Sequence, residues 1–298
     1  MTKSRRLAYL ALIFNAIIWG AAFPIVKPAF AFITPLQYLY LRFLAAGLFA
    51  IPIFLYFSLK LRPKVSYLIK CLALETLQML ALPVLYLGLD KTSALDASLI
   101  GATGPAFVIL GGILFLRERQ EKREWQGLAL SLAGSLLIVF EPLITGAYNG
   151  GSGSLTGNLY IIAYNILYMA YALLAKKVYK KKPPFYLGSL TYLLAALIFA
   201  GLTVNNVGLP AWDQLLHPSV LFPVLYMAIP GGILAFILYL YAQSKIEVSE
   251  ANLFYYLNGV VAIPTAYFLL GEVPTLPTIL AILLIAFGVY RAEFRQKR

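Results

Sequence analysis

The chain of 298 residues is 61% hydrophobic and only 12% charged, and its mean hydropathy is +0.81. An ordinary soluble domain carries about 25% charged residues, so this composition excludes one water-soluble core. The single cysteine, Cys71, also excludes a disulfide-stapled fold, which leaves the class of integral membrane proteins.

Ten apolar stretches follow one another along the chain, each close to the length of about 20 residues that a helix needs to cross a bilayer core of roughly 30 Å. The first stretch follows three basic residues, as a signal peptide would, but its apolar run is too long and lacks a small-residue cleavage site. We therefore interpret it as a membrane helix. The predicted spans are 7–26, 35–57, 66–88, 93–116, 124–141, 155–175, 184–204, 219–242, 248–270 and 275–292.

The basic residues predict the orientation of these spans. If the N-terminus is cytoplasmic, 20 of the 24 Lys and Arg residues lie in cytoplasmic segments. Lys27 and Lys91 lie in outside loops, and Arg42 and Lys70 lie within spans. By the positive-inside rule, both termini are expected in the cytoplasm and the protein in the cell membrane, inner or plasma, as a multi-pass protein. The net charge of +12 then reflects topology and lipid contact, and we expect no nucleic-acid partner.

The two halves of the chain resemble each other at an offset of 154 residues. The paired positions are Asp96 with Glu250, Ala97 with Ala251, Leu99 with Leu253, Glu118 with Glu272, and Gly134 with Gly288. The boundary is a Gly/Ser segment, 146–154, of the composition of a flexible linker. Because each half holds five predicted helices, the second half must enter the membrane inverted. The prediction is an all-α membrane protein with ten transmembrane helices in two inverted five-helix repeats, 1–145 (helices 1–5) and 155–298 (helices 6–10), joined by an extracytoplasmic linker. Inverted repeats are typical of secondary transporters.

These motifs resemble the ten-helix, EamA-type members of the drug/metabolite transporter superfamily. The matching residues are Trp19-Gly20-Ala21-Ala22-Phe23, Arg42-Phe43, Leu85-Tyr86-Leu87-Gly88-Leu89, Thr103-Gly104-Pro105, Arg117-Glu118-Arg119, Trp125, Gly127, Tyr239-Leu240-Tyr241-Ala242 and Leu270-Gly271-Glu272. One departure is Gly259, which stands where the first repeat has Pro105. The resemblance implies two EamA-like repeats and gradient-driven export or uptake of small metabolites, often amino acids, without ATP.

Polar side chains inside spans are costly, so each is a candidate for function. Arg42 and Glu75 are predicted at levels that differ by about 6 Å if each span rises 1.5 Å per residue. They then form a charge pair along the substrate path or a structural pair, or Arg42 instead snorkels outward. If they pair, Glu75 stays ionised; if they are apart, Glu75 is a candidate for proton coupling. The candidate substrate-binding residues are Asn15, Trp19, Arg42, Glu75, Gln78, Tyr164, Tyr168, Asn252 and Tyr256.

Helix breakers lie at several mid-span positions, where they can serve as hinges or simply reflect membrane helices in general. The clearest are Pro83, Gly104-Pro105, Pro230-Gly231-Gly232 and Pro264. Enzyme signatures, metal-ligand clusters and cofactor motifs are lacking, so we expect no catalytic residue, no metal and no cofactor. The main hypothesis is a secondary active transporter, exporter or permease, of amino acids or related compounds that works by alternating access, with protons as a candidate coupling ion. The alternatives are a membrane enzyme acting on lipid-linked substrates and a non-transporting scaffold. The sequence leaves the oligomeric state open.

Overall fold

The computed structural model describes residues 3–61, 64–117, 122–146, 154–178, 184–246 and 254–293, which are helical almost throughout and contain no strand. Within this part of the chain, eight helical stretches are long and apolar enough to cross a membrane. Two shorter apolar stretches, Phe254–Leu270 and Leu276–Gly288, follow them. The predicted all-α membrane fold is confirmed.

Each predicted span coincides with one helix or with one broken helix. The first half contains α1 (Lys3–Gly20), α2 (Ala22–Val26), the 3-10 helix η1 (Lys27–Ala31), α3 (Pro35–Leu61), α4 (Val65–Lys91), α5 (Ala94–Ala102), α6 (Gly104–Leu116) and α7 (Lys122–Thr145). The second half contains α8 (Leu155–Val178), α9 (Pro184–Asn206), α10 (Trp212–Leu216), α11 (Pro218–Ala228), the π-helix η2 (Ile229–Leu234), α12 (Ala235–Gln243), the 3-10 helix η3 (Phe254–Tyr256), α14 (Leu257–Leu270) and α15 (Leu276–Glu293). The short helix α10 lies in a segment that the sequence predicted as a loop.

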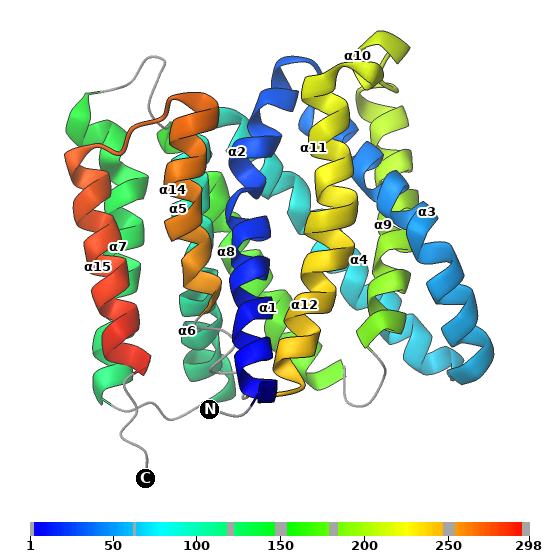
Figure 1. Cartoon of the computed structure of the whole chain (residues 1–298), viewed down its shortest axis with the longest axis horizontal. Helices are drawn as coiled ribbons and strands as arrows, with labels where there is room; N and C mark the ends of the chain where they lie inside the picture. The colour runs from blue at the N-terminus through cyan, green and yellow to red at the C-terminus, as the bar shows by residue number, and fades with distance from the viewer. Residues whose placement is uncertain are drawn as a thin grey trace.

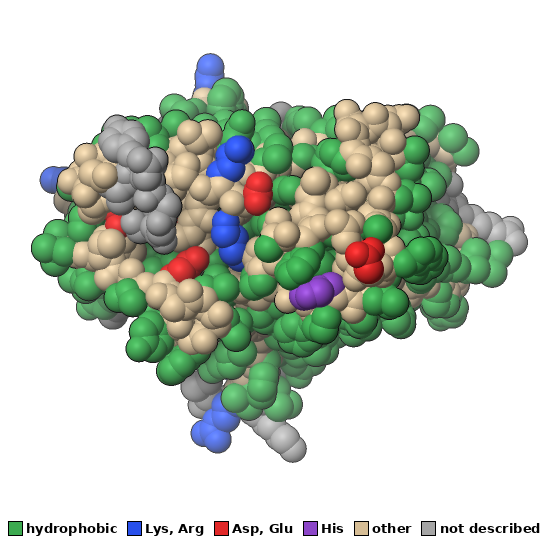
Figure 2. Space-filling view, turned by 90° about the horizontal axis from the view of Figure 1, so that it is seen from above, with side chains coloured by type: hydrophobic (Ala, Val, Ile, Leu, Met, Phe, Trp, Pro, Cys, Tyr) green, Lys and Arg blue, Asp and Glu red, His purple; other side chains and the backbone are tan. Residues whose placement is uncertain are grey.

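The long helices stand side by side in one bundle (Figure 1). α1 begins and α15 ends on the same face, which we call the terminal face, and α10 lies on the opposite face, the α10 face. Figure 2 looks onto the α10 face, where acidic side chains and some basic ones lie in a band across the middle, further basic side chains reach the edges, and apolar side chains form most of the outline. This distribution suits a bundle whose rim contacts lipid tails.

The largest helix contacts keep their pattern when the two halves of the chain are exchanged. α7 packs on α15, α3 on α9 and α5 on α14, so each of these contacts joins spans that hold the same position in the two predicted repeats. The next largest contacts occur in matched pairs: α4 on α8 with α1 on α12, α6 on α8 with α1 on α14, and α3 on α11 with α4 on α9. Smaller contacts, such as α7 on α8 and α3 on α4, have no counterpart of similar size among the described residues.

Two glycines that the sequence offset of 154 pairs bring α7 and α15 close together. A Cβ atom on Gly134 would stand 2.8 Å from the Ala281 carbonyl oxygen, and one on Gly288 would stand 2.7 Å from the Gly127 carbonyl oxygen. Small residues let helix backbones approach in this way in membranes. The α7–α15 contact therefore depends on the absence of a side chain at both positions.

We expect Gly288→Ala to lower the thermal midpoint of the purified protein in detergent. The added methyl group must displace α7 backbone, and such overpacking costs typically about 1–3 kcal/mol. The matched control is Gly201→Ala in α9, where a Cβ atom would meet nothing within 4 Å and where alanine favours the helix by about 1 kcal/mol. Equal midpoints for the two variants would contradict the packing.

The predicted helix breakers differ in their effect on the helices: some lie in continuous helices and others mark a break. Pro83 lies inside the continuous helix α4 and Pro264 inside α14, whereas the chain breaks at Thr103, before Pro105, and forms the π-helix η2 over Ile229–Leu234. Side chains from other helices satisfy carbonyls at both breaks. The Asn165 amide donates to the Ile100 carbonyl at 3.0 Å, and the Trp19 indole donates to the Gly231 carbonyl at 2.8 Å.

Candidate functional site

Arg42, on α3, points its guanidinium group toward tyrosines of the neighbouring helices. It donates a hydrogen bond to the hydroxyl of Tyr86 on α4. Its Cζ atom lies 4.9 Å from the ring centre of Phe43 and 5.8 Å from that of Tyr86. Tyr192 on α9 and Tyr164 on α8 also interact with it electrostatically. Side chains from three other helices therefore converge on one cation.

Glu75 forms a separate network at the junction of α4, α8 and α9. Its carboxylate accepts hydrogen bonds from the hydroxyls of Tyr171, at 2.9 Å, and Thr191, at 2.8 Å, and the side chain is 3% exposed. A buried carboxylate is stabilised by such donors. Glu75 thus joins three helices.

The predicted charge pair between Arg42 and Glu75 is wrong, because Arg42 binds Tyr86 instead. The prediction failed because it took α4 to be no longer than the bilayer core. α4 runs from Val65 to Lys91, 27 residues or about 40 Å, so it is longer than a 30 Å core. Glu75 lies about 24 Å from the end of α4 at Lys91, whereas Arg42 lies only about 10 Å along α3 from Pro35. The two side chains therefore stand at different levels.

Gln78, Tyr164 and Tyr168, three of the candidate residues, lie together in the structure. The Gln78 amide nitrogen donates to the Tyr164 hydroxyl at 3.3 Å. The rings of Tyr164 and Tyr168 are 6.1 Å apart, and that of Tyr171 is 6.0 Å from Tyr168. The Gln78 amide oxygen is buried and, among the described residues, has no hydrogen-bond partner. This row of tyrosines on α8 connects the surroundings of Arg42 with those of Glu75.

Asn15 and Trp19, on α1, hydrogen-bond to the backbone around the π-helix. The Asn15 amide donates to the Ala235 carbonyl at 2.7 Å, and Trp19 donates to Gly231. The Trp19 ring lies 5.7 Å from the ring of Tyr239 and 6.2 Å from that of Tyr255. Their polar groups therefore hold a broken helix, while the indole ring remains part of an aromatic group.

The last two candidates, Asn252 and Tyr256, lie close together in the sequence. Tyr256 is the last residue of η3 and packs against the main hydrophobic core. Asn252 lies outside the described residues, as do Glu118, Glu250, Ala251 and Leu253 of the sequence repeat.

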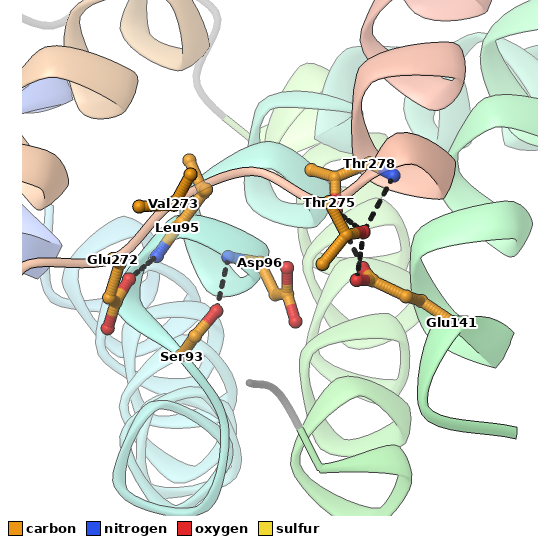
Figure 3. A pocket seen from close by; sticks show the side chains of 8 residues that line it. All are labelled: Ser93, Leu95, Asp96, Glu141, Glu272, Val273, Thr275 and Thr278. Carbon is orange, nitrogen blue, oxygen red and sulfur yellow. Dashed lines mark hydrogen bonds between the residues drawn. The ribbon is translucent and has the colours of Figure 1, made fainter. Parts of the chain in front are cut away.

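A second polar cluster, which the sequence did not predict as a site, lies at the α10 face between α5, α7 and the segment before α15. Figure 3 shows its small pocket, with Asp96 between Glu272 and Glu141. Ser93, Leu95, Asp96, Glu141, Glu272, Val273, Thr275 and Thr278 line it. In the described part of the chain no group of acidic, histidine and cysteine side chains could hold a metal ion.

Two of these carboxylates connect the halves of the chain. Glu272 accepts hydrogen bonds from the backbone N–H groups of Ala94, at 2.9 Å, and Leu95, at 2.7 Å, at the start of α5. The positive end of the helix dipole stabilises a carboxylate there. Glu141 accepts hydrogen bonds from the hydroxyls of Thr275 and Thr278, the latter at 2.7 Å.

Lys27 of η1 and Asn158 of α8 both form hydrogen bonds with the turn between α4 and α5, at the α10 face. The Lys27 ammonium group donates to the carbonyls of Leu89, at 2.7 Å, and Asp90, at 2.6 Å, where a cation complements the end of α4. The Thr92 hydroxyl donates to the Asn158 amide oxygen of α8 at 2.5 Å. The sequence did carry signals for this cluster, because Lys27 is one of few basic residues in a predicted outside loop and Glu141 ends a predicted span.

The fold and these two clusters define the class of a multi-span helical membrane protein with polar side chains inside its bundle. The model of the EamA-like transporter family matches residues 6–140 and 155–292. The chain therefore belongs to the EamA-like transporter family.

Several curated relatives carry names of the same kind. A protein of Archaeoglobus fulgidus named "uncharacterized transporter" is 23% identical over 97% of this chain and 98% of its own length. YcxC of Bacillus subtilis, also named an uncharacterized transporter, is 26% identical over 89% of this chain and 86% of its own. YedA of Escherichia coli, named an uncharacterized inner membrane transporter, is 27% identical over 92% and 86%.

A solved structure, described only as the crystal structure of a protein, has the same fold. It superposes with a TM-score of 0.65 at 18% identity and covers 95% of both chains. Together with the named relatives, the family assigns this protein to the membrane transporters of small molecules.

Proposed function

We propose that the protein is a secondary active transporter, an exporter or permease, that moves small metabolites of the amino-acid class by alternating access. The observation that carries this proposal is that the largest helix contacts keep their pattern when the halves are exchanged. Inverted repeats give a transporter two equivalent shapes, one open to each side. The separate matches of the family model to residues 6–140 and 155–292 support the same division.

The proposed repeats are residues 1–145 and 155–298, with 146–154 as the linker. Gly134 and Gly288, paired by the sequence offset, both lie in the α7–α15 contact, which supports a two-fold relation between the halves. The proposed substrate site lies among α3, α4, α8 and α9, where Arg42, Gln78, Tyr164 and Tyr168 gather. Both halves contribute helices to it.

We further propose that the protein lies in the cell membrane with both termini in the cytoplasm, so that the α10 face is extracytoplasmic. In a Cys71→Ala background, Trp212→Cys should react with an impermeant maleimide on intact cells, and Lys64→Cys should react only after lysis. Trp212 is 79% exposed on α10, and Lys64 is exposed at the start of α4. The reverse labelling pattern would invert the orientation.

The function is tested by transport in proteoliposomes. Purified protein is supplied with pooled amino acids, organic acids, nucleobases and amines, with and without an imposed proton gradient. We expect uptake or counterflow of at least one pool above empty liposomes, and accumulation with the gradient if protons are the coupling ion. No transport of any pool in either direction would contradict the proposal.

A further inference from the structure

The π-helix η2 leaves one of its carbonyls to a side chain of another helix. In an α-helix each backbone N–H donates to the carbonyl four residues before it, so the Ala235 N–H would donate to Gly231. It donates instead to the carbonyls of Pro230 and Gly232. The Trp19 indole, from α1, donates to the Gly231 carbonyl at 2.8 Å. Trp19 therefore takes the place that the Ala235 N–H would have in a regular α-helix.

Glycine at position 232 permits the π conformation. A Cβ atom on Gly232 would stand 3.0 Å from the Met227 carbonyl oxygen and 3.2 Å from the Tyr192 hydroxyl, closer than ordinary contacts. Glycine is also among the weakest formers of α-helix. The residue that makes room for the π-helix thus also weakens the α-helix, which narrows the free-energy gap between the two conformations.

A change of η2 from π-helix to α-helix would turn α12 and leave α11 in place. A π-helix spaces its hydrogen bonds five residues apart and an α-helix four, so the change winds the following helix by one residue, or about 100°. Two tyrosine hydroxyls hold α11: Tyr226 donates to the Ile18 carbonyl at 2.7 Å, and Tyr38 donates to the Pro223 carbonyl at 3.1 Å. After the change, each residue of α12 would occupy the place that the following residue held before.

Such a turn would reshape the aromatic group beside the tyrosine row of α8. Tyr239 belongs to α12; its ring lies 5.7 Å from that of Trp19, and it interacts electrostatically with Tyr168. Tyr255 of η3 lies 6.2 Å from Trp19 and interacts with the same tyrosine. A turn of about 100° carries Tyr239 away from both Trp19 and Tyr168. The side chain that holds the π-helix therefore lies between the moving helix and the proposed substrate site.

We propose that the Trp19 indole and the Ala235 N–H exchange at the Gly231 carbonyl, and that this exchange switches η2 between a π state and an α state. Trp19 is then a positioning residue, which sets the rotation of α12 and the place of Tyr239. π-helices occur mostly as single turns inside α-helices, frequently at functional sites. The role of the switch in alternating access rests on the proposed function, since α1 and α12 come from different halves of the chain and stand side by side (Figure 1).

Two cysteine pairs distinguish the states in a Cys71→Ala background. Ala8 of α1 and Ala242 of α12 belong to one buried cluster and are both 0% exposed, so Ala8→Cys with Ala242→Cys, the π pair, should form a disulfide in the π state. In the α state residue 241 takes the place of residue 242, so Ala8→Cys with Tyr241→Cys, the α pair, should form one there. The measurement is the rate of disulfide formation of each pair in membranes treated with an oxidant.

Two variants that act through different contacts should both favour the α state. Trp19→Phe keeps an aromatic ring beside Tyr239 and removes the indole N–H. Gly232→Ala crowds the π conformation and strengthens the α-helix. Each should raise the rate of the α pair about fivefold, which is about 1 kcal/mol at 1.4 kcal/mol per factor of ten and is typical of one hydrogen bond.

The matched controls are Trp212→Phe, at a position 79% exposed on α10, and Gly201→Ala, where a Cβ atom would meet nothing within 4 Å. Both should leave the two rates at the wild-type values. Loss of stability alone would slow the π pair without speeding the α pair. An unchanged α-pair rate in Trp19→Phe or in Gly232→Ala, or a π pair that does not form in the wild-type background, would overturn the switch.

The disulfide rates need no substrate, so they separate the switch from the proposed function. A protein that transports while the α-pair rate stays unchanged in both variants contradicts the switch alone. A protein whose α-pair rate rises as expected but that transports nothing contradicts the proposed function and keeps the exchange at Gly231.

Discussion

Replacing Glu75 by glutamine is expected to abolish gradient-driven accumulation of substrate while substrate exchange continues. Glu75 is a buried carboxylate about 15 Å along α4 from Val65, and it links three helices through Tyr171 and Thr191. Arg42 binds Tyr86 and does not pair with Glu75, so if protons are the coupling ion, Glu75 is the residue that we test for coupling. Glutamine keeps the shape and can still accept a hydrogen bond, but it cannot ionise.

The measurement is uptake in proteoliposomes with and without a proton gradient, alongside counterflow without one. Asp213→Asn is the matched control, because Asp213 is an exposed carboxylate on α10. We expect Glu75→Gln to accumulate no more substrate than wild type does without the gradient, and Asp213→Asn to behave as wild type. Accumulation by Glu75→Gln at the wild-type level, with equal protein in the liposomes, would remove this residue from coupling.

The fold was largely predictable because membrane helices are set by length and hydropathy. A lipid core imposes runs of about 20 apolar residues. The sequence predicts ten such spans, and in the described part of the chain eight helical stretches are long and apolar enough, with two shorter ones after them. The breaks were less predictable. Pro83 and Pro105 look alike in the sequence, yet only Pro105 begins a new helix, since the outcome depends on which neighbours satisfy the freed carbonyls.

The contacts among the candidate residues were only partly predictable. Tyr164 and Tyr168 adjoin each other because spacing by four residues places side chains on one helix face, but the hydrogen bond from Gln78 on α4 to Tyr164 on α8 joins two helices. Arg42 and Glu75 do not pair. The prediction failed because the depth of each residue was counted from the end of its span, which ignores helix length and tilt. Contacts between residues far apart in the chain, such as Glu272 with Ala94, left no local pattern to read.

The contact between Glu272 and the start of α5 gives the second large expected effect, on access from the α10 face. Glu272 spans the halves of the chain, and its carboxylate holds two backbone N–H groups. Hydrogen bonds to charged groups contribute about 1.5–3 kcal/mol each, and every 1.4 kcal/mol changes an equilibrium about tenfold. If this contact closes the α10 face in the transport cycle, Glu272→Ala should raise the population of molecules open on that side by about tenfold or more.

Leu95, which lines the pocket beside Glu272 and is 3% exposed, provides the probe for this opening. In a Cys71→Ala background, the cysteine of Leu95→Cys should react with an impermeant maleimide on intact cells about tenfold faster when Glu272→Ala is added. With Glu272→Gln the labelling rate of Leu95→Cys should lie between these two rates, since the amide oxygen of glutamine still accepts a hydrogen bond. Asp213→Ala, which removes an exposed carboxylate on the α10 face, should leave the rate unchanged, and Trp212→Cys should label equally in every background. Equal rates for Leu95→Cys with and without Glu272 would show that the α10 face is held closed by other contacts, of which Glu141 with Thr275 and Thr278 is the next to remove.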